Sequence, residues 1–323
     1  FGVKDFSANV AGFVTLGGDL GFKKIGNDIV AVGNNVSATL EATDTLYTRL
    51  SSADFGLMVG AARTSFELTN GVFNAQLDAL GGVSAQDVRV QYTNADGAVE
   101  AGEALSVGSI NYTFADAIAA DTVAFQVEGF AANVADFISV SGDLAFRRVD
   151  SDIVAVGSQV SASLDAGEAA YVRLNQASFG LMLGADGTTA FELKDGSFEA
   201  VIDGLGGVSA DEVIVQYTNA ATTVAANTTL ETLDLSYTFA DAIAADTVAF
   251  GVKGFSADVA GFVSLSGDLG FAKTGDDIVA VGTHVSASLE ATVTLYTRLS
   301  NADFGLIVGA ARTSFELSNG VFN

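Results

Sequence analysis

Residues 13–22 read Phe-Val-Thr-Leu-Gly-Gly-Asp-Leu-Gly-Phe, and large apolar side chains alternate in them with small or polar ones. Val14, Leu16, Leu20 and Phe22 are the apolar set. Alternation with a period of two is typical of a β-strand that has one apolar face. The same alternation recurs along the chain and predicts an all-β protein. It is found at 30–40, 55–59, 66–68, 73–79, 88–92 and 110–114.

The chain also repeats itself. Phe-Gly-Val-Lys-Asp-Phe at 1–6 returns as Phe-Gln-Val-Glu-Gly-Phe at 125–130 and as Phe-Gly-Val-Lys-Gly-Phe at 250–255. Residues 1–74 and 250–323 differ at 14 of 74 positions when they are compared without gaps. The motif begins at residues 1, 125 and 250, so the full repeats are 124 and 125 residues long. Each therefore has the size of a small domain and exceeds the roughly 20–50 residues of solenoid repeats. The expected domains are two full repeats, 1–124 and 125–249, and a partial repeat, 250–323.

Turn-forming residues separate the alternating stretches. The cluster Lys-Ile-Gly-Asn-Asp at 24–28 is typical of a tight connection between hairpin strands. Spacing of this kind predicts roughly eight to ten short strands in each repeat. Helix is expected only as single turns, at 84–88 and 115–120. Further turns are expected at 34–35, 51–54, 69–71, 81–82 and 93–97.

Strands with one apolar face can bury that face in several ways. We expect tandem antiparallel β-sandwich or β-roll units of about 125 residues. A continuous β-solenoid is the alternative, although no shorter internal repeat occurs. A membrane β-barrel with its apolar face outward is a further alternative, against which the absence of Trp weighs. The segment 112–125 recurs unchanged at 237–250 and is the expected joint between units.

Composition excludes several classes of partner. The chain carries 39 acidic and 14 basic residues, a net charge of −25, which argues against nucleic acid and anionic membrane surfaces. It has no Cys, so neither a disulfide nor a thiolate site is expected. It has no Pro, which fits a chain of paired strands and removes a common guard against edge-to-edge pairing. No apolar run is long enough for a transmembrane helix. Because it starts at Phe1 and ends at Asn323, the counterpart of Asn74, we expect a segment of a longer repetitive protein.

Catalytic motifs are missing from the sequence. The single histidine, His284, stands where the other repeats have Asn35 and Gln159, so we interpret it as a surface turn residue. No nucleophile elbow, phosphate loop or HExxH motif occurs. The glycines at 17–21 lie inside an alternating stretch and indicate a bulge or tight bend. We therefore expect no enzyme activity.

Carboxylates are the abundant functional groups. Oxygen ligands in turns can hold calcium, and calcium at a joint would stiffen a tandem array. Asp also forms turns and caps helices, which is the alternative interpretation of each residue. The candidate calcium ligands are Asp116, Asp121, Asp241 and Asp246 in the joint segment, and Asp28, Asp152 and Asp277 in the hairpin turns.

Three phrases carry a resemblance to a known class of protein. They are Val-Ser-Leu-Ser-Gly-Asp-Leu-Gly-Phe at 263–271, Asp-Ile-Val-Ala-Val-Gly at 277–282 and Val-Arg-Val-Gln-Tyr-Thr-Asn at 88–94. They resemble the tandem repeats of very large secreted bacterial surface and adhesin-like proteins. The resemblance implies an adhesion, matrix or filament role at the cell surface, and it supplies no catalytic residues.

These observations predict a structural protein. We expect an extracellular bacterial filament, matrix fibre or adhesin stalk, because nearly identical repeats present nearly identical interfaces. Self-association into the fibre would be either a homopolymer or one long repetitive chain. The alternatives are an outer-membrane β-barrel and a carbohydrate-binding β-repeat protein.

Overall fold

The computed structural model describes residues 1–149, 151–167, 170–274, 276–292, 295–309 and 312–323. Strands account for 76% of the residues and helix for 1%, which confirms the all-β prediction. Within these ranges the single helical element is a 3₁₀ turn, η1 (Asp78–Leu80). The helical turns expected at 84–88 and 115–120 are wrong, because the former is strand and the latter is irregular. No helix in the described ranges has the length and apolar character that crossing a membrane requires.

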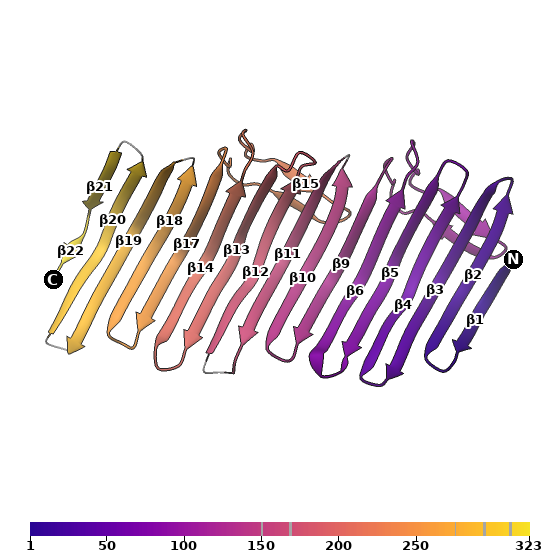
Figure 1. Cartoon of the computed structure of the whole chain (residues 1–323), viewed down its shortest axis with the longest axis horizontal. Coiled ribbons are helices and arrows are strands. Elements are labelled where there is room, and N and C mark those ends of the chain that lie inside the picture. The colour runs from indigo at the N-terminus through magenta and orange to yellow at the C-terminus, as the bar shows by residue number, and fades with distance from the viewer. Residues whose placement is uncertain (150, 168–169, 275, 293–294, 310–311) are drawn as a thin grey trace. The chain divides into compact units, whose positions relative to one another are not determined.

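In the part of the chain that the structure describes, eighteen strands form one antiparallel sheet, and two short hairpins lie outside it (Figure 1). The sheet strands are β1 (Gly2–Val10), β2 (Val14–Ile25), β3 (Asp28–Thr43), β4 (Leu46–Val59), β5 (Thr64–Leu77), β6 (Gly81–Thr93), β9 (Val123–Val134), β10 (Ile138–Val149), β11 (Asp152–Asp165), β12 (Ala170–Leu183), β13 (Thr189–Ile202), β14 (Gly206–Thr218), β17 (Thr247–Val259), β18 (Val263–Thr274), β19 (Asp277–Thr292), β20 (Leu295–Gly309), β21 (Arg312–Ser318) and β22 (Val321–Phe322). The hairpins are β7 (Ala104–Val107) with β8 (Ile110–Thr113) and β15 (Thr229–Glu231) with β16 (Ser236–Thr238).

Contacts divide the chain into two compact units. The first unit contains residues 1–136, 140–155 and 232–235, and the second contains 137–139, 156–231 and 236–323. Within each unit, strands that follow one another in the chain pair through short connections. The β2–β3 hairpin closes between Ile25 and Asp28, which confirms the turn expected at 24–28.

Three of the expected turns are wrong, and a fourth, expected at 81–82, is displaced, because these residues begin β6 and the chain reverses at 78–80. Residues 34–35, 51–54 and 69–71 lie inside the long strands β3, β4 and β5, where the pairing register shifts at bulges. Asn35, Ser52 and Asn70 have φ angles of 49°, 60° and 59° there. Asn, Ser and Gly favour both turns and bulges, because each tolerates the left-handed conformation or bonds locally to the backbone. The chain therefore continues in the same strand instead of reversing.

Aspartates stabilise these bulges. The N–H of Asn35 donates to Asp54 Oδ1 at 2.8 Å, and the N–H of Asp5 donates to Asp19 Oδ1 at 2.8 Å. Gly18 in β2 has φ of 124°, and the β2–β3 pairing register shifts between Gly17 and Asp19. The glycine-rich stretch is therefore a bulge, as expected. His284 occupies the bulge of β19, where its N–H donates to Asp303 Oδ1. Its side chain is exposed, as expected, but the residue lies in a strand and not in a turn.

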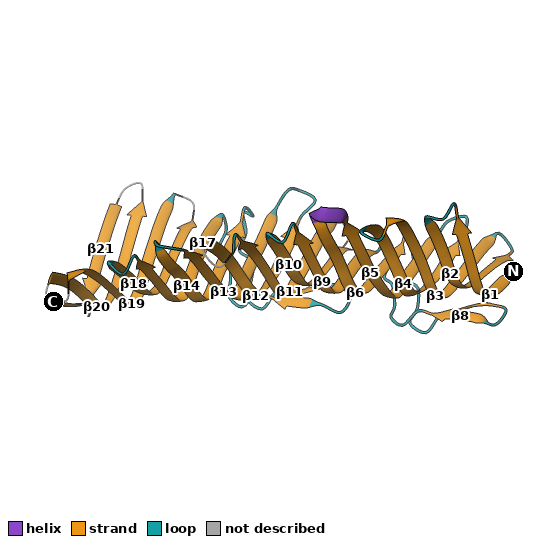
Figure 2. Ribbon diagram, turned by 90° about the horizontal axis from the view of Figure 1, so that it is seen from below, coloured by secondary structure: helices purple, strands orange, loops and turns teal. Residues whose placement is uncertain are grey.

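A segment of each full repeat leaves the sheet and lies on one of its faces. We call residues 94–122 insert A and residues 219–246 insert B; they contain the hairpins β7–β8 and β15–β16 (Figure 2). Each insert lies in the chain between two strands that are neighbours in the sheet, so β6 pairs with β9 and β14 pairs with β17. The second layer is therefore a small insert, and it takes the place of the second full sheet that a sandwich would have. The core between insert A and the sheet consists of three sheet residues and seven residues of the insert: Val30, Val32, Met58, Val99, Leu105, Val107, Ile110, Tyr112, Phe114 and Ile118.

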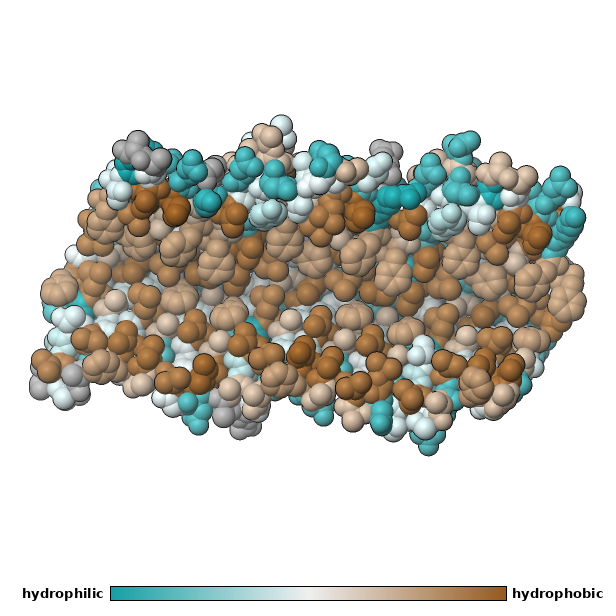
Figure 3. Space-filling model, in the orientation of Figure 1, coloured by the Kyte–Doolittle hydropathy of each residue, from teal (hydrophilic) through white to brown (hydrophobic). Residues whose placement is uncertain are grey.

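The opposite face of the sheet, here called the open face, presents large apolar side chains to solvent. Gly21 faces insert A, so its neighbour Phe22 in the same strand faces the other way. Phe22 is 47% exposed, and its counterparts Phe146 and Phe271 are 43% and 49% exposed. Figure 3 shows hydrophobic atoms gathered over the strands, with hydrophilic atoms along the loops.

Candidate functional site

Small residues allow the inserts to lie close to the sheet. A Cβ atom on Gly56 of β4 would lie 2.4 Å from Cδ1 of Tyr112 in insert A. A Cβ on Gly21 of β2 would lie 2.7 Å from Cβ of Val107. In the second repeat a Cβ on Gly180 would lie 2.4 Å from Cδ1 of Tyr237 in insert B. Any side chain at these glycines would displace the aromatic or aliphatic residue above it.

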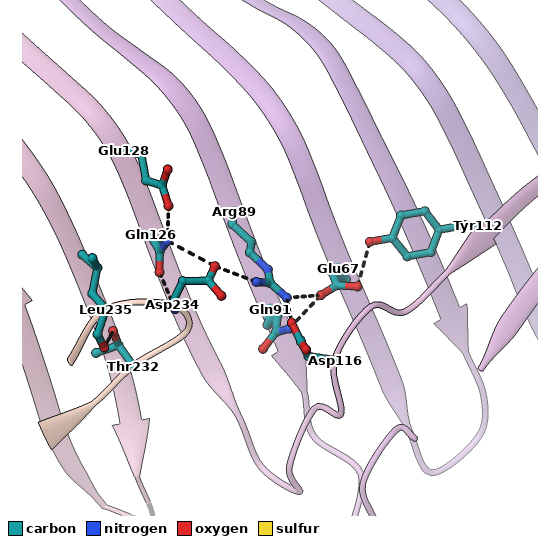
Figure 4. Close-up of polar contacts among 10 residues, drawn as sticks. All are labelled: Glu67, Arg89, Gln91, Tyr112, Asp116, Gln126, Glu128, Thr232, Asp234 and Leu235. Atoms are coloured by element: carbon teal, nitrogen blue, oxygen red, sulfur yellow. Dashed lines mark hydrogen bonds and ion pairs between the residues drawn. The ribbon is translucent and has the colours of Figure 1, made fainter. Parts of the chain in front are cut away.

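A buried glutamate joins insert A to the sheet (Figure 4). Glu67 of β5 has no solvent exposure, and its carboxylate accepts hydrogen bonds from three donors. Tyr112 donates its hydroxyl at 2.8 Å, Gln91 donates Nε2 at 2.7 Å, and Arg89 donates at 3.3 Å. Because burial of a charged carboxylate is costly without such donors, Glu67 holds the hairpin in one position on the sheet.

Arg89 of β6 connects this glutamate to two further carboxylates. Its guanidinium donates to Asp116 of insert A at 2.6 Å and to Asp234 of insert B at 2.8 Å. Its burial acts to lower the pKa of Arg89, but the hydrogen bonds to Asp116 and Asp234 outweigh that effect, and the pKa lies above its ordinary value. Arg89 therefore stays charged at every pH at which the protein is folded.

The tip of insert B belongs to the first unit. Residues 232–235 pack there, and Asp234 forms a two-way contact with Gln126 of β9. The N–H of Asp234 donates to Gln126 Oε1 at 2.9 Å, and Gln126 Nε2 donates to Asp234 Oδ2 at 3.3 Å. A cavity of about 90 Å³ lies beside this contact, lined by Arg89, Asp116, Arg147 and neighbouring residues of the same unit. A loop encoded in the second repeat is thus anchored on strands of the first.

The second repeat keeps the glutamate and loses the arginine. Glu192 is 2% exposed and accepts from Tyr237 Oη at 2.8 Å and from Gln216 Nε2 at 2.6 Å. Ile214 stands at the position of Arg89. The part common to both repeats is therefore a glutamate, a glutamine and a tyrosine, and this part suffices to fix an insert.

Tyr112 and Tyr237 should make the free energy of unfolding decrease as the pH becomes alkaline. Burial, and then the hydrogen bond to glutamate, raise the pKa of both Tyr112 and Tyr237 above the ordinary 10.0. The unfolded chain releases these protons near pH 10 while the folded chain keeps them, so their contribution is complete below pH 10 and is lost as pH rises further. We expect the free energy of unfolding in urea to fall between pH 9 and 11.5 by an amount of about 1 kcal/mol or more.

A double variant separates these tyrosines from the rest of the protein. Tyr112→Phe with Tyr237→Phe is less stable at pH 8, because Glu67 and Glu192 each lose a donor. Its stability should fall less between pH 9 and 11.5 than that of the parent chain. An unchanged pH dependence in the double variant would contradict the assignment.

The structure disperses the candidate calcium ligands. Asp116 is paired with Arg89, and Asp121 and Asp246 donate their N–H groups to Ala95 and Ala220 at the base of each insert. Asp28, Asp152 and Asp277 begin β3, β11 and β19, and Asp241 is exposed in insert B. Across the ranges that the structure describes, no three His, Asp or Glu side chains are arranged to hold a metal ion. Calcium binding stays a prediction.

Glu67, Arg89 and Gln126 were not anticipated. One signal was present in the sequence, because glutamate recurs at 67, 192 and 316 within otherwise alternating strands.

Comparison of the chain with protein-family models, with curated proteins and with solved structures found no match.

Proposed function

We propose that this protein is a structural repeat protein without catalytic activity, which assembles with copies of itself into a bacterial extracellular filament, matrix fibre or adhesin stalk. The observation that supports it most strongly is the open face. The buried polar cluster supports it as well, because its carboxylates and its arginine are all engaged in holding the inserts.

The open face carries the same exposed aromatic residues in both units. In the first unit Phe22, Phe125 and Phe146 are 47%, 40% and 43% exposed. In the second unit Phe250 and Phe271, the counterparts of Phe125 and Phe22, are 45% and 49% exposed, and Phe315, the counterpart of Phe66, is 64% exposed. Soluble monomers rarely expose contiguous apolar surface of this kind, and such surface marks an interaction site.

A second copy of the chain is the occupant that we propose for this face. Repeats with nearly the same sequence present nearly the same surface, so one copy can pack on another with every repeat contributing. Complete burial of a phenylalanine side chain contributes about 1.5–3 kcal/mol, so burial of the exposed parts of six per chain contributes a free energy of the same order as the cost of association. The net charge of −25 opposes unlimited lateral aggregation through repulsion between chains.

Electron microscopy together with sedimentation velocity tests this function. We expect purified chain to form fibres or regular sheets, at protein concentrations in the micromolar range, and we expect added salt to promote them by screening the negative charge. A chain that sediments as a compact monomer at all concentrations and salt conditions would contradict the proposal. The resemblance to secreted surface proteins supports the cellular location, which surface labelling of the producing cell would test.

A further inference from the structure

The first unit contains a larger cleft beside insert A, with a volume of about 420 Å³. Residues at the bulges of β3 to β6 line it from the sheet, and β8 of insert A and the tip of insert B line it from the other side. We call it the bulge cleft; the lining residues that matter most are Asn34, Thr69, Asp87, Arg89, Tyr112 and Thr113.

The bulge cleft carries an excess of negative charge. Three aspartates, Asp54, Asp87 and Asp234, line it together with one cation, Arg89. Arg89 is ion-paired with three carboxylates, including that of Asp234 (Figure 4), so its positive charge is more than balanced. Among the described residues, no cation forms an ion pair with Asp54 or Asp87.

Two oxygen atoms of the cleft residues are buried without a hydrogen-bond donor. Asn34 Oδ1 and Asp87 Oδ1 are shielded from solvent and have no partner in the part of the chain that the structure describes. A buried acceptor of this kind costs free energy, and the cost is larger for a charged carboxylate than for an amide. A ligand that brings N–H donors and a positive charge would remove both costs.

The second repeat places a cation of its own at the corresponding position. Lys194 replaces Thr69, and its Nζ donates to the carbonyl oxygen of Thr238 at 3.1 Å. The same Nζ lies 5.0 Å from the centroid of the Tyr237 ring, which is within reach of a cation–π interaction. The counterparts of this tyrosine and threonine are residues 112–113, which line the bulge cleft. The first repeat therefore keeps the surroundings of the ammonium group without the lysine.

Asp87 shows a second difference of the same kind. Its counterpart Glu212 lies opposite Lys253 in the β14–β17 pairing and accepts a hydrogen bond from Nζ at 2.8 Å. Asp87 lies opposite Glu128 in the β6–β9 pairing, and like charges directly opposite each other are destabilising. The second repeat thus supplies two lysines where the first repeat has Thr69 and Glu128.

We propose that the bulge cleft binds a primary alkylammonium group, supplied by a free amine or by a lysine side chain of another polypeptide. The three N–H donors and the positive charge of this group suit the free oxygens of Asn34 and Asp87. Tyr112 and Thr113 provide the surroundings that Tyr237 and its neighbour provide for a lysine in the second repeat. Binding here does not depend on the proposed assembly, because the cleft lies on the insert side of the sheet and not on the open face.

An NMR titration of the full ¹⁵N-labelled chain with n-butylammonium chloride tests the proposal. This probe has the carbon chain and the charge of a lysine side chain. We expect saturable shifts of the amide signals at 34–35 and 86–87, relative to sodium chloride at the same ionic strength. Asp87→Asn should weaken binding about tenfold or more, and it should keep the fold because it relieves the repulsion with Glu128. Glu212→Gln, at the same position of the second repeat, is the matched control and should leave binding unchanged.

Two other cations distinguish a specific site from attraction by charge alone. Tetramethylammonium has the same charge and no N–H donor, so it should bind about tenfold more weakly than butylammonium. Calcium chloride should not displace butylammonium beyond the effect of ionic strength. Absence of saturable shifts, equal binding of tetramethylammonium, full binding by Asp87→Asn, or specific displacement by calcium would each overturn the proposal.

A third ligand identifies the source of the ammonium group. Nα-acetyl-lysine methylamide carries the same ammonium group on a peptide unit. Tighter binding of this compound than of butylammonium would support a lysine of another polypeptide as the ligand, and weaker binding would support a free amine.

Thr69→Lys places the ammonium group in the chain itself. It should remove binding of butylammonium and raise the midpoint of urea unfolding by about 0.2–0.5 M, because its charge is met by the carboxylates of the cleft. Thr69→Met also removes the threonine hydroxyl and adds a side chain of similar length without charge, so it should not raise the midpoint. Equal midpoints for the lysine and methionine variants would contradict a site for an ammonium group.

Discussion

Glu67→Leu is expected to destabilise the first unit by about 3–5 kcal/mol, because it removes the acceptor of three hydrogen bonds in a buried site. The hydroxyl of Tyr112 and the amide of Gln91 would be left without this acceptor. The smallest rearrangement that returns them to water is release of the β7–β8 hairpin. Hydrogen exchange of the amides in 104–113 should therefore accelerate together with the loss of stability in urea.

The third repeat contains a matched control for this variant. Glu316 has the same strand position as Glu67 but is exposed, so Glu316→Leu should change stability by no more than about 0.5 kcal/mol. Equal losses in the two variants would show that glutamate is required by the strand itself and not by the insert above it.

The second repeat provides a further comparison. Ile214 replaces Arg89 there, and Glu192 is still buried with its tyrosine and glutamine donors. Arg89→Ile should therefore cost less than Glu67→Leu, about 1–3 kcal/mol. The remaining partners, Asp116 and Asp234, have side chains that are 64% and 52% exposed and can be hydrated in place. The contact of residues 232–235 with the first unit is the part that this variant should weaken most.

The all-β class could be predicted from the sequence, whereas the lengths of the strands could not. Alternation along 13–22 reports on one face of one strand and is independent of what lies next to it. Asn35, Ser52 and Asn70 are different, because a left-handed residue can either reverse the chain or produce a bulge within a strand. Which of the two occurs depends on the neighbouring strand and on acceptors such as Asp54, which are distant in sequence.

The cluster around Glu67 depends even more strongly than the strand lengths on contacts between residues that are distant in sequence. Alternation assigns Glu67 to the polar, exposed side of a strand, and that is where Glu316 does lie. Glu67 is buried only because insert A crosses over it. Likewise, the sequence offers Asp116 only as a candidate calcium ligand, because its partner Arg89 lies 27 residues away on another strand and no local pattern reveals that pairing. Repetition of the glutamate could be recognised in the sequence; the element that covers it could not.

Replacing Phe22, Phe146 and Phe271 together by lysine is expected to abolish assembly. The three residues occupy one repeat position on the open face, and a charged group there would have to be desolvated without a partner in any packed interface. The fold itself should be retained, because each side chain is already 43–49% exposed. Fibres in electron micrographs and fast-sedimenting species should both disappear, while the circular dichroism spectrum of β-structure stays unchanged.

Two matched variants separate loss of apolar surface from a change of charge. Lysine at Asn27, Ser151 and Asp276, which are exposed residues of the turns that follow the same strands, gives at least the same change of charge away from the open face. Assembly should persist in this control, because only the apolar face is required for packing. Glutamate at the three phenylalanine positions should abolish assembly as lysine does, although the two changes move the net charge in opposite directions. If the glutamate variant alone failed to assemble, repulsion between acidic chains would be the cause, and the open face would not be the interface.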